Sequence, residues 1–171
     1  MSKSQAVTFG HKGFWAYDVV AGVFLKHLID AAQESTEANA DWLAKAVSNW
    51  RVWAVLGGDL GLPLDEHWTL EQQATFIALA EHACTTLATR ELISQEEIVS
   101  WPFVDDLRID TRGDQVVPTA PIVELGRAII ALIRDELPEA PKGEAWFFGS
   151  ETRTVRMDAS WDGRWNAHRR R

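Results

Sequence analysis

Residues 119–137, TAPIVELGRAIIALIRDEL, predict the clearest helix of the chain. Their apolar side chains recur at intervals of three and four residues, which places them on one face of a helix. That face comprises Ile122, Leu125, Ile129, Ile133 and Leu137, widened by Ile130 and Leu132. Thr119 is a candidate N-cap and Pro138 ends the periodicity. We therefore expect a core helix over 120–137.

Three further helices are expected in the first ninety residues, again from the spacing of apolar side chains. We place them at 14–33, at 39–56 and from Thr69 onward. The pair Gly57-Gly58 is expected to end the second of these helices. The third begins with Thr69-Leu70-Glu71-Gln72, a capping box in which the Thr and Gln side chains each bind the backbone N–H of the other residue.

Strands are expected in the second half of the chain. Residues 104–110 and 115–117 are predicted to pair across a turn at 111–114. The runs 144–148 and 152–157 predict another hairpin, with a two-residue turn at 149–150. The pattern indicates an α+β fold that is predominantly helical. We expect about four main helices packed in one core, with a small antiparallel β-hairpin element in the second half.

A single globular domain over 1–158 is expected, because 171 residues lie within the usual size of one domain. Residues 159–171 lack apolar periodicity but carry Trp161 and Trp165 among four arginines. We expect this Arg- and Trp-containing C-terminal tail to be frayed, or to be ordered by packing on the domain or on another chain.

The charge distribution favours a basic protein as partner. The chain contains 25 Asp and Glu against 17 Lys and Arg, which gives a net charge of −8 at pH 7. Residues 158–171 carry +2, so the remaining 157 residues carry −10. An acidic body repels the phosphates of nucleic acids and attracts basic proteins. We therefore expect a protein partner and no binding to nucleic acid.

Several features indicate a soluble cytoplasmic protein that does not bind membranes. No basic segment followed by an apolar run marks a secretory signal. The longest stretch without a charged residue spans nine positions, for example 72–80, whereas a membrane span requires about 20 mostly apolar residues. The single cysteine, Cys84, excludes an internal disulfide and suits a reducing compartment.

Possible metal ligands are concentrated in two places. These are the loop expected at 57–68, with Asp59, Asp65, Glu66 and His67, and the acidic pair Asp105-Asp106. Carboxylate and imidazole groups bind divalent metals. However, the single histidine has no partner at metal-site spacing, and strand alternation would place the paired aspartates on opposite faces. We expect no metal, no cofactor and no catalytic residue.

The chain contains nine tryptophans, and this residue is enriched at the centres of protein interfaces. We expect Trp50 and Trp146 to be buried, whereas others lie beside the expected core stripes. The predicted partner-binding residues are three tryptophans with five carboxylates: Trp15, Trp68 and Trp101 with Asp59, Asp65, Glu66, Asp105 and Asp106.

We therefore interpret the chain as an acidic protein-binding module that neutralises a basic partner. Small acidic inhibitors such as the immunity proteins (antitoxins) of bacteria, which inhibit a toxin or effector domain, share this general character. The chain carries no diagnostic motif of any immunity family. One alternative is a metal-assisted hydrolase that uses His67, Asp65 and the region of Asp105 and Asp106. The other is a self-associating structural or regulatory subunit with its aromatic residues in a homodimer interface.

Overall fold

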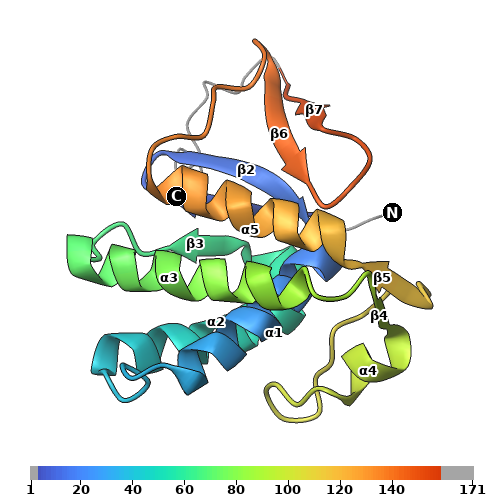
Figure 1. Ribbon diagram of the computed structural model, residues 1–171. Helices are drawn as coiled ribbons and strands as arrows, with labels where there is room; N and C mark the ends of the chain where they lie inside the picture. The colour runs from blue at the N-terminus through green and yellow to red at the C-terminus, as the bar shows by residue number, and fades with distance from the viewer. Residues whose placement is uncertain (1–3, 159–171) are drawn as a thin grey trace.

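The computed structural model describes residues 4–158, so the expected tail at 159–171 lies outside the described residues. The described part combines five helices with a five-stranded and a two-stranded sheet (Figure 1). The helices are α1 (Asp18–Glu34), α2 (Asp41–Leu60), α3 (Leu70–Leu87), α4 (Gln95–Ser100) and α5 (Thr119–Ile133). The strands are β1 (Ser4–Phe9), β2 (Lys12–Tyr17), β3 (Leu62–Leu64), β4 (Leu92–Ser94), β5 (Val116–Pro118), β6 (Glu144–Phe148) and β7 (Thr154–Arg156).

The N-terminal segment forms a β-hairpin, which the sequence analysis did not predict. The helix expected from residue 14 begins at Asp18, after β1 and β2. Phe14 and Ala16 are fully buried, whereas Trp15 is half-buried. Burial of every second residue is the pattern of a strand. The expected helix start was wrong because Phe14 and Tyr17 are three residues apart, which also fits a helical stripe.

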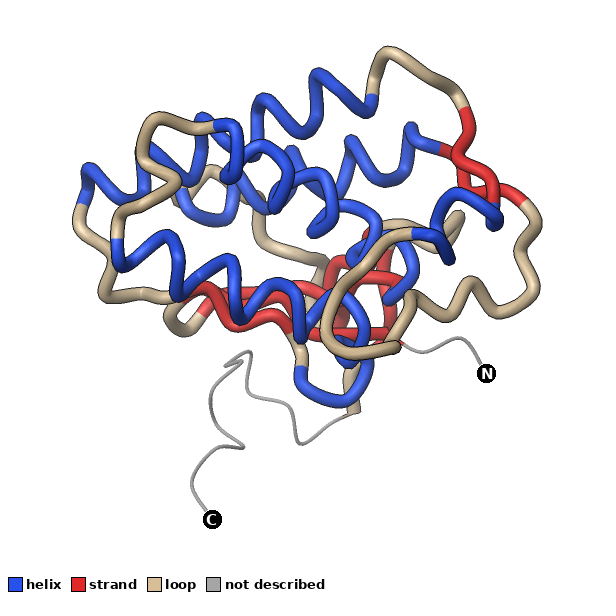
Figure 2. Tube along the Cα trace, turned by 90° about the horizontal axis from the view of Figure 1, so that it is seen from below, coloured by secondary structure: helices blue, strands red, loops and turns tan. Residues whose placement is uncertain are grey.

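The strand order of the larger sheet is β3-β1-β2-β6-β7, so β2 is the central strand. β1 pairs antiparallel with β2 and parallel with β3, while β2 pairs parallel with β6. Val7, Phe14 and Ala16 point into the hydrophobic core that the sheet shares with the helices. We call this side the inner face and the other side the outer face. Figure 2 shows the strands gathered beside the helical layer.

The helix α2 continues through the two glycines that were expected to end it. It extends to Leu60, and Gly61 follows with a φ of +69°. A Cβ atom at Gly57 would lie 2.0 Å from Oε1 of Gln5 in β1. The expected helix end was wrong because Gly57 permits close contact between the helix and the sheet, while Gly61 provides the left-handed conformation that terminates the helix.

The capping box at the start of α3 is confirmed. The Thr69 side chain accepts a hydrogen bond from the Gln72 backbone N–H at 3.2 Å. In return, the Gln72 side chain accepts a hydrogen bond from the Thr69 backbone N–H at 2.9 Å. Helix α5 is also present, although it ends at Ile133 instead of residue 137. Asp135 has a φ of +58°, a left-handed conformation typical of the residue after a helix.

The hairpin expected over 104–117 is wrong. Residues 104–115 contain no strand, and β5 pairs antiparallel with β4 across the intervening helix α4. Asp105 and Arg112 have φ values of +50° and +56°, which interrupt an extended conformation. The later hairpin is present as β6 and β7, but its connection is longer than two residues, since Trp146 pairs with Thr154.

A glycine allows α5 to approach α1 and α3 closely. A Cβ atom at Gly126 would lie 2.4 Å from Sγ of Cys84 in α3 and 2.6 Å from Cε2 of Phe24 in α1. Both distances are far below van der Waals contact, and the two neighbours are buried. The contact at Gly126 therefore brings three helices of the core together.

We expect Gly126→Ala to destabilise the protein by about 1–3 kcal/mol, because the added methyl group overpacks this contact. This loss should exceed the gain of about 1 kcal/mol that Ala has over Gly in a helix. Urea denaturation followed by circular dichroism measures the change. The control is Arg127→Ala at the exposed neighbouring position, where we expect a change within about 0.5 kcal/mol. Equal stability of wild type and Gly126→Ala would contradict the packing argument.

Candidate partner-binding surface

The tryptophan predicted before α3 belongs to the core. Trp68 is 9% exposed, and its ring packs against Trp42 of α2 and Phe76 of α3 with centroid distances of 5.7 and 5.0 Å. Trp68, a predicted partner-binding residue, is therefore largely shielded from solvent by the core. The indole fills the space between the two helices because the chain turns directly from β3 into α3 at this point.

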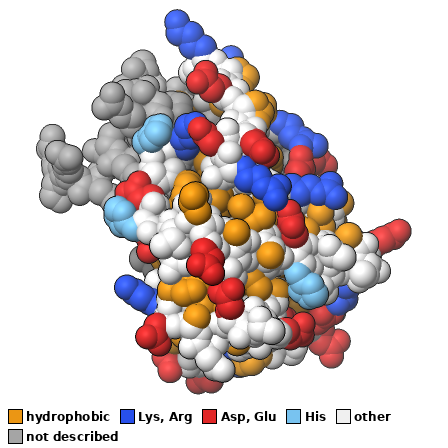
Figure 3. Space-filling model, turned by 60° about the vertical axis from the view of Figure 1, so that its left-hand side comes forward, with side chains coloured by type: hydrophobic (Ala, Val, Ile, Leu, Met, Phe, Trp, Pro, Cys, Tyr) orange, Lys and Arg blue, Asp and Glu red, His pale blue; other side chains and the backbone are white. Residues whose placement is uncertain are grey.

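Asp65 and Glu66 lie exposed at the same end of α3. The Asp65 carboxylate accepts a hydrogen bond from the backbone N–H of His67 at 2.9 Å, which stabilises the turn before the helix. Asp59 lies in the last turn of α2, and its side chain is outside the described part. Figure 3 shows the side of the molecule that is on the left in Figure 1. On this face, acidic side chains are dispersed among apolar and uncharged ones.

Trp101, Asp105 and Asp106 follow α4, beyond the opposite end of α3 (Figure 1). A helix of 18 residues is about 27 Å long, so Asp65 and Asp105 are too far apart to share one small site. Trp15 lies in a third region, on the outer face of the sheet. The structure therefore does not bring the eight predicted residues together.

Residues 91–118, which we call the acidic segment, combine negative charge with a fixed position. They contain seven Asp and Glu against two Arg. Five buried apolar side chains attach the segment to the body: Ile93, Ile98, Phe103, Ile109 and Val117. The acidic segment includes β4, α4 and β5 and the irregular chain between them. Its carboxylates are thus presented by a packed structure instead of a freely moving loop.

Exposed apolar side chains are concentrated in the same segment. Six large hydrophobic residues of the described part are exposed, and four belong to the acidic segment: Leu92, Val99, Leu107 and Val116, each 40–49% exposed. Ser94 pairs with Val116, so Leu92 and Val116 lie diagonally on the exposed face of the β4–β5 ribbon. Exposed carboxylates accompany them: Glu91, Glu96, Asp105, Asp106, Asp110 and Asp114. Apolar contacts bordered by charge are typical of protein-binding surfaces.

The apolar residues and Glu91 and Glu96 of this surface were not among the predicted binding residues. Leu92 and Val116 are neighbours only because β4 and β5 pair across α4 and the irregular chain after it. No local periodicity signals that pairing. The negative charge of the segment was visible in the sequence and identified Asp105 and Asp106.

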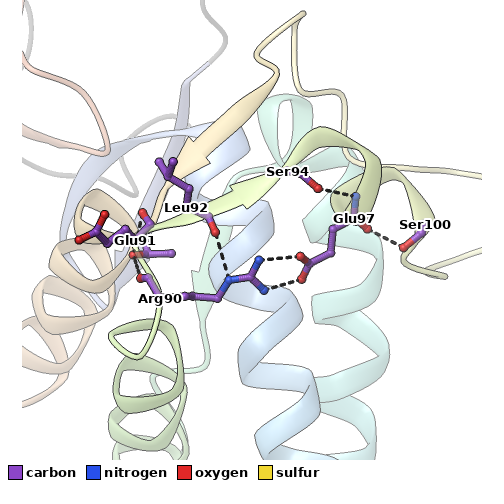
Figure 4. A network of polar contacts seen from close by, with 7 residues as sticks. Arg90, Glu91, Leu92, Ser94, Glu97 and Ser100 are labelled. Carbon is purple, nitrogen blue, oxygen red and sulfur yellow. Dashed lines mark hydrogen bonds and ion pairs between the residues drawn. The ribbon is translucent and has the colours of Figure 1, made fainter.

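Arg90 attaches α4 to the end of α3 (Figure 4). Its Nη1 and Nη2 donate to the two carboxylate oxygens of Glu97 at 2.8 and 2.7 Å, and its Nε donates to the Leu92 carbonyl at 3.1 Å. Ser94 caps α4 by accepting from the Glu97 backbone N–H at 3.2 Å. The hydrogen bond to Glu97 raises the pKa of Arg90. This network fixes the orientation of the exposed residues on β4 and α4.

A second ion pair attaches the other end of the acidic segment. Nη2 of Arg112 lies 2.7 Å from Oδ2 of Asp18, the first residue of α1, and both side chains are largely buried. The hydrogen bond to Asp18 raises the pKa of Arg112. The Asp110 carboxylate accepts from the Arg112 backbone N–H at 2.9 Å, which supports the left-handed turn at Arg112.

Trp101 lies partly buried against α1. Lys26 Nζ is 5.3 Å from the centroid of the indole, and the His27 ring meets the indole edge-on at a centroid distance of 5.9 Å. Nε2 of His27 is buried without a hydrogen-bond partner. Burial lowers the pKa of His27; the charges of Lys26 and Arg90 act in the same direction, and those of Asp30 and Glu97 oppose it. Trp101 thus packs as a bridge between α1 and the acidic segment.

Within residues 4–158, no helix is long and apolar enough to cross a membrane. The same residues contain no group of three or more His, Cys, Asp or Glu placed to hold a metal ion. No protein-family model, curated protein or solved structure matches the chain.

We expect Arg90→Gln to loosen the acidic segment locally. Loss of the paired hydrogen bonds to Glu97 should raise the amide hydrogen-exchange rates of residues 95–100 on the order of tenfold. Global stability should fall by about 1 kcal/mol or less, because the pair is partly exposed. The control is Arg134→Gln, which removes the exposed pair with Glu81 on α3. Similar exchange in the two variants would contradict the role given to Arg90.

The lowered pKa of His27 predicts that stability decreases in acid. Below about pH 6.5 the unfolded chain binds a proton at His27 that the folded chain does not bind, so the free energy of unfolding falls. In His27→Gln this contribution is absent. The loss of unfolding free energy between pH 7 and pH 5 should therefore be smaller than in wild type, as measured by urea denaturation at each pH. An unchanged loss would contradict the prediction.

Proposed function

We propose that this chain is an acidic protein-binding module that binds a basic protein through the acidic segment and neutralises it. Its role would be that of an immunity-type antitoxin, which blocks a bacterial toxin or effector domain. The observation that carries the proposal is the concentration of four exposed apolar side chains among exposed carboxylates on residues 91–118.

The two kinds of side chain would have separate roles in binding. The carboxylates create a negative field that increases the rate of encounter with a positively charged protein. The exposed apolar residues would then lose water on contact and provide most of the affinity. Leu92 and Val116 are suited to this role, because the paired strands hold them in fixed positions.

The carboxylates of the acidic segment are available for a partner. Among the described residues, Glu97 of this segment forms an ion pair, whereas Glu91, Glu96, Asp105, Asp106 and Asp114 form none. Glu97 instead holds the segment in place through Arg90. The surface thus separates charges that maintain the structure from charges that face solvent.

The test begins with the isolation of partners from the native cytosol at low salt and their identification by mass spectrometry. We expect one stoichiometric basic protein, encoded beside this chain, whose activity is inhibited when the complex forms. With that protein, Asp105→Asn/Asp106→Asn should lower the association rate constant by roughly tenfold at low salt. Stopped-flow fluorescence measures the rate, and added salt should reduce the difference.

The matched control is Asp65→Asn/Glu66→Gln, which removes two exposed charges at the other end of α3 and should change the rate less. Leu92→Ser/Val116→Ser should increase the dissociation rate, because it removes the apolar contact. Failure to recover any stoichiometric partner would contradict the proposed function. Equal effects of the two charge-removing variants would contradict the location of the binding surface.

A further inference from the structure

The outer face of the five-stranded sheet contains no charged residue within its described strands. Alternation along the strands and the pairing registers place ten residues there, of which Tyr17, at the end of β2, also packs against the core. They are Pro63 of β3, Ser4, Ala6 and Thr8 of β1, Gly13, Trp15 and Tyr17 of β2, Ala145 and Phe147 of β6, and Val155 of β7. On a chain with one charged residue in four, this is an unusual surface.

Two residues of this face are buried away from the core. Ala145 is 2% exposed and Phe147 is 9% exposed. Among the buried apolar residues of the described part, only these two lie outside the hydrophobic cluster that the helices form with the inner face. Their neighbours Trp146 and Phe148 pack against that cluster. Helices α1, α2 and α5 contact the strands of the sheet from the inner face, so they do not account for the burial of Phe147.

Two hollows lie at opposite ends of the outer face. One, with a volume of about 370 Å³, is lined by Tyr17, Phe147 and Val155 together with the β6–β7 connection. The other, of about 440 Å³, includes Gly13, Ala145 and Met157 and continues around the edge of the sheet to Trp146 and to Leu132 of α5. Asp158, the last described residue, also lines the second hollow. The described part of the chain therefore ends beside this edge of the outer face.

We propose that residues 159–171 of the same chain bind to the outer face of the sheet. These 13 residues span at most about 43 Å when extended, whereas Gly13 and Tyr17, which line the two hollows, are four positions apart on β2, a distance of about 13 Å. The tail is therefore long enough to cross the face from the hollow at Asp158 to the hollow at Tyr17. Trp161 and Trp165 provide the large apolar side chains that such a surface requires.

The distribution of charge also favours residues 159–171 as the segment that binds to the outer face of the sheet. Residues 159–171 carry four Arg and one Asp, a net charge of +3, while residues 1–158 carry −11. The hollow beside Asp158 is lined by Glu139, Glu144 and Asp158 together with Lys12 and Lys142, so the attraction comes from the net charge of the body and not from this hollow alone. A second copy of the chain would bring one acidic body against another. The tail is attracted to the body electrostatically and is already tethered to it, which gives it a high effective concentration.

The experiment is cysteine cross-linking in the full-length chain, with Cys84→Ala to remove the native thiol. Ala6→Cys introduces a thiol on the outer face, and Ala167→Cys introduces one near the end of the tail. A short bis-maleimide reagent should join them within one chain. The matched control combines Ala167→Cys with Thr85→Cys, an exposed position on α3. We expect cross-linking to Ala6→Cys to be at least about tenfold faster than to the control position.

A further pair of variants tests which side chains hold the tail. Trp161→Ala/Trp165→Ala in the Ala6→Cys background should reduce the cross-linking rate to that of the control, with an unchanged circular dichroism spectrum. Equal rates at Ala6→Cys and Thr85→Cys would overturn the proposal, since they would indicate an unbound tail. Cross-links that form mainly between two chains would also overturn it in favour of a second copy. This readout requires no partner protein, so it is independent of the proposed function.

Discussion

The two-residue alternation along β2 is the constraint on which both faces of the sheet depend. Because β2 is the central strand, its pairings with β1 and β6 determine which side chains of those strands face the helices. Phe14 and Ala16 enter the core, whereas Trp15 lies on the outer face. A slip of one residue would exchange the two sets and place the Trp15 indole where the core holds Ala16. Large aromatic residues on both sides thus fix the register.

Local signals predicted the helices better than the strands. The capping box at Thr69 and the apolar stripe of α5 depend on residues within four positions of each other, so the sequence alone was sufficient to identify them. The strands of the N-terminal hairpin depend on distant partners, since Val7 pairs with Leu62 and Trp15 with Phe147. Apolar spacing near residue 14 fits a helix and a strand equally well, and only the tertiary pairing distinguishes them.

The candidate surface was predictable in its charge but not in its apolar part. Asp105 and Asp106 are exposed on the acidic segment, and their charge was evident from composition. Leu92 and Val116 become neighbours only because β4 and β5 pair with each other across α4. Arg90 holds α4 in position through its hydrogen bond to Glu97. In contrast, Trp68 lies in the core. The sequence did not predict this burial, because an indole beside a helix start can pack inward as readily as outward. Residue type alone does not determine exposure.

The two surfaces differ in chemistry, and this difference determines what can cover each of them. The described strands place no charged residue on the outer face, and apolar residues such as Trp15 and Phe147 favour association when such a face is left in water. In the arrangement that we propose, a tethered tail would cover this face at all concentrations. In the acidic segment, Leu92 and Val116 lie among exposed carboxylates, which favour contact with water when no partner is bound. A partner that binds reversibly therefore suits the acidic segment, whereas residues 159–171 of the same chain suit the outer face of the sheet.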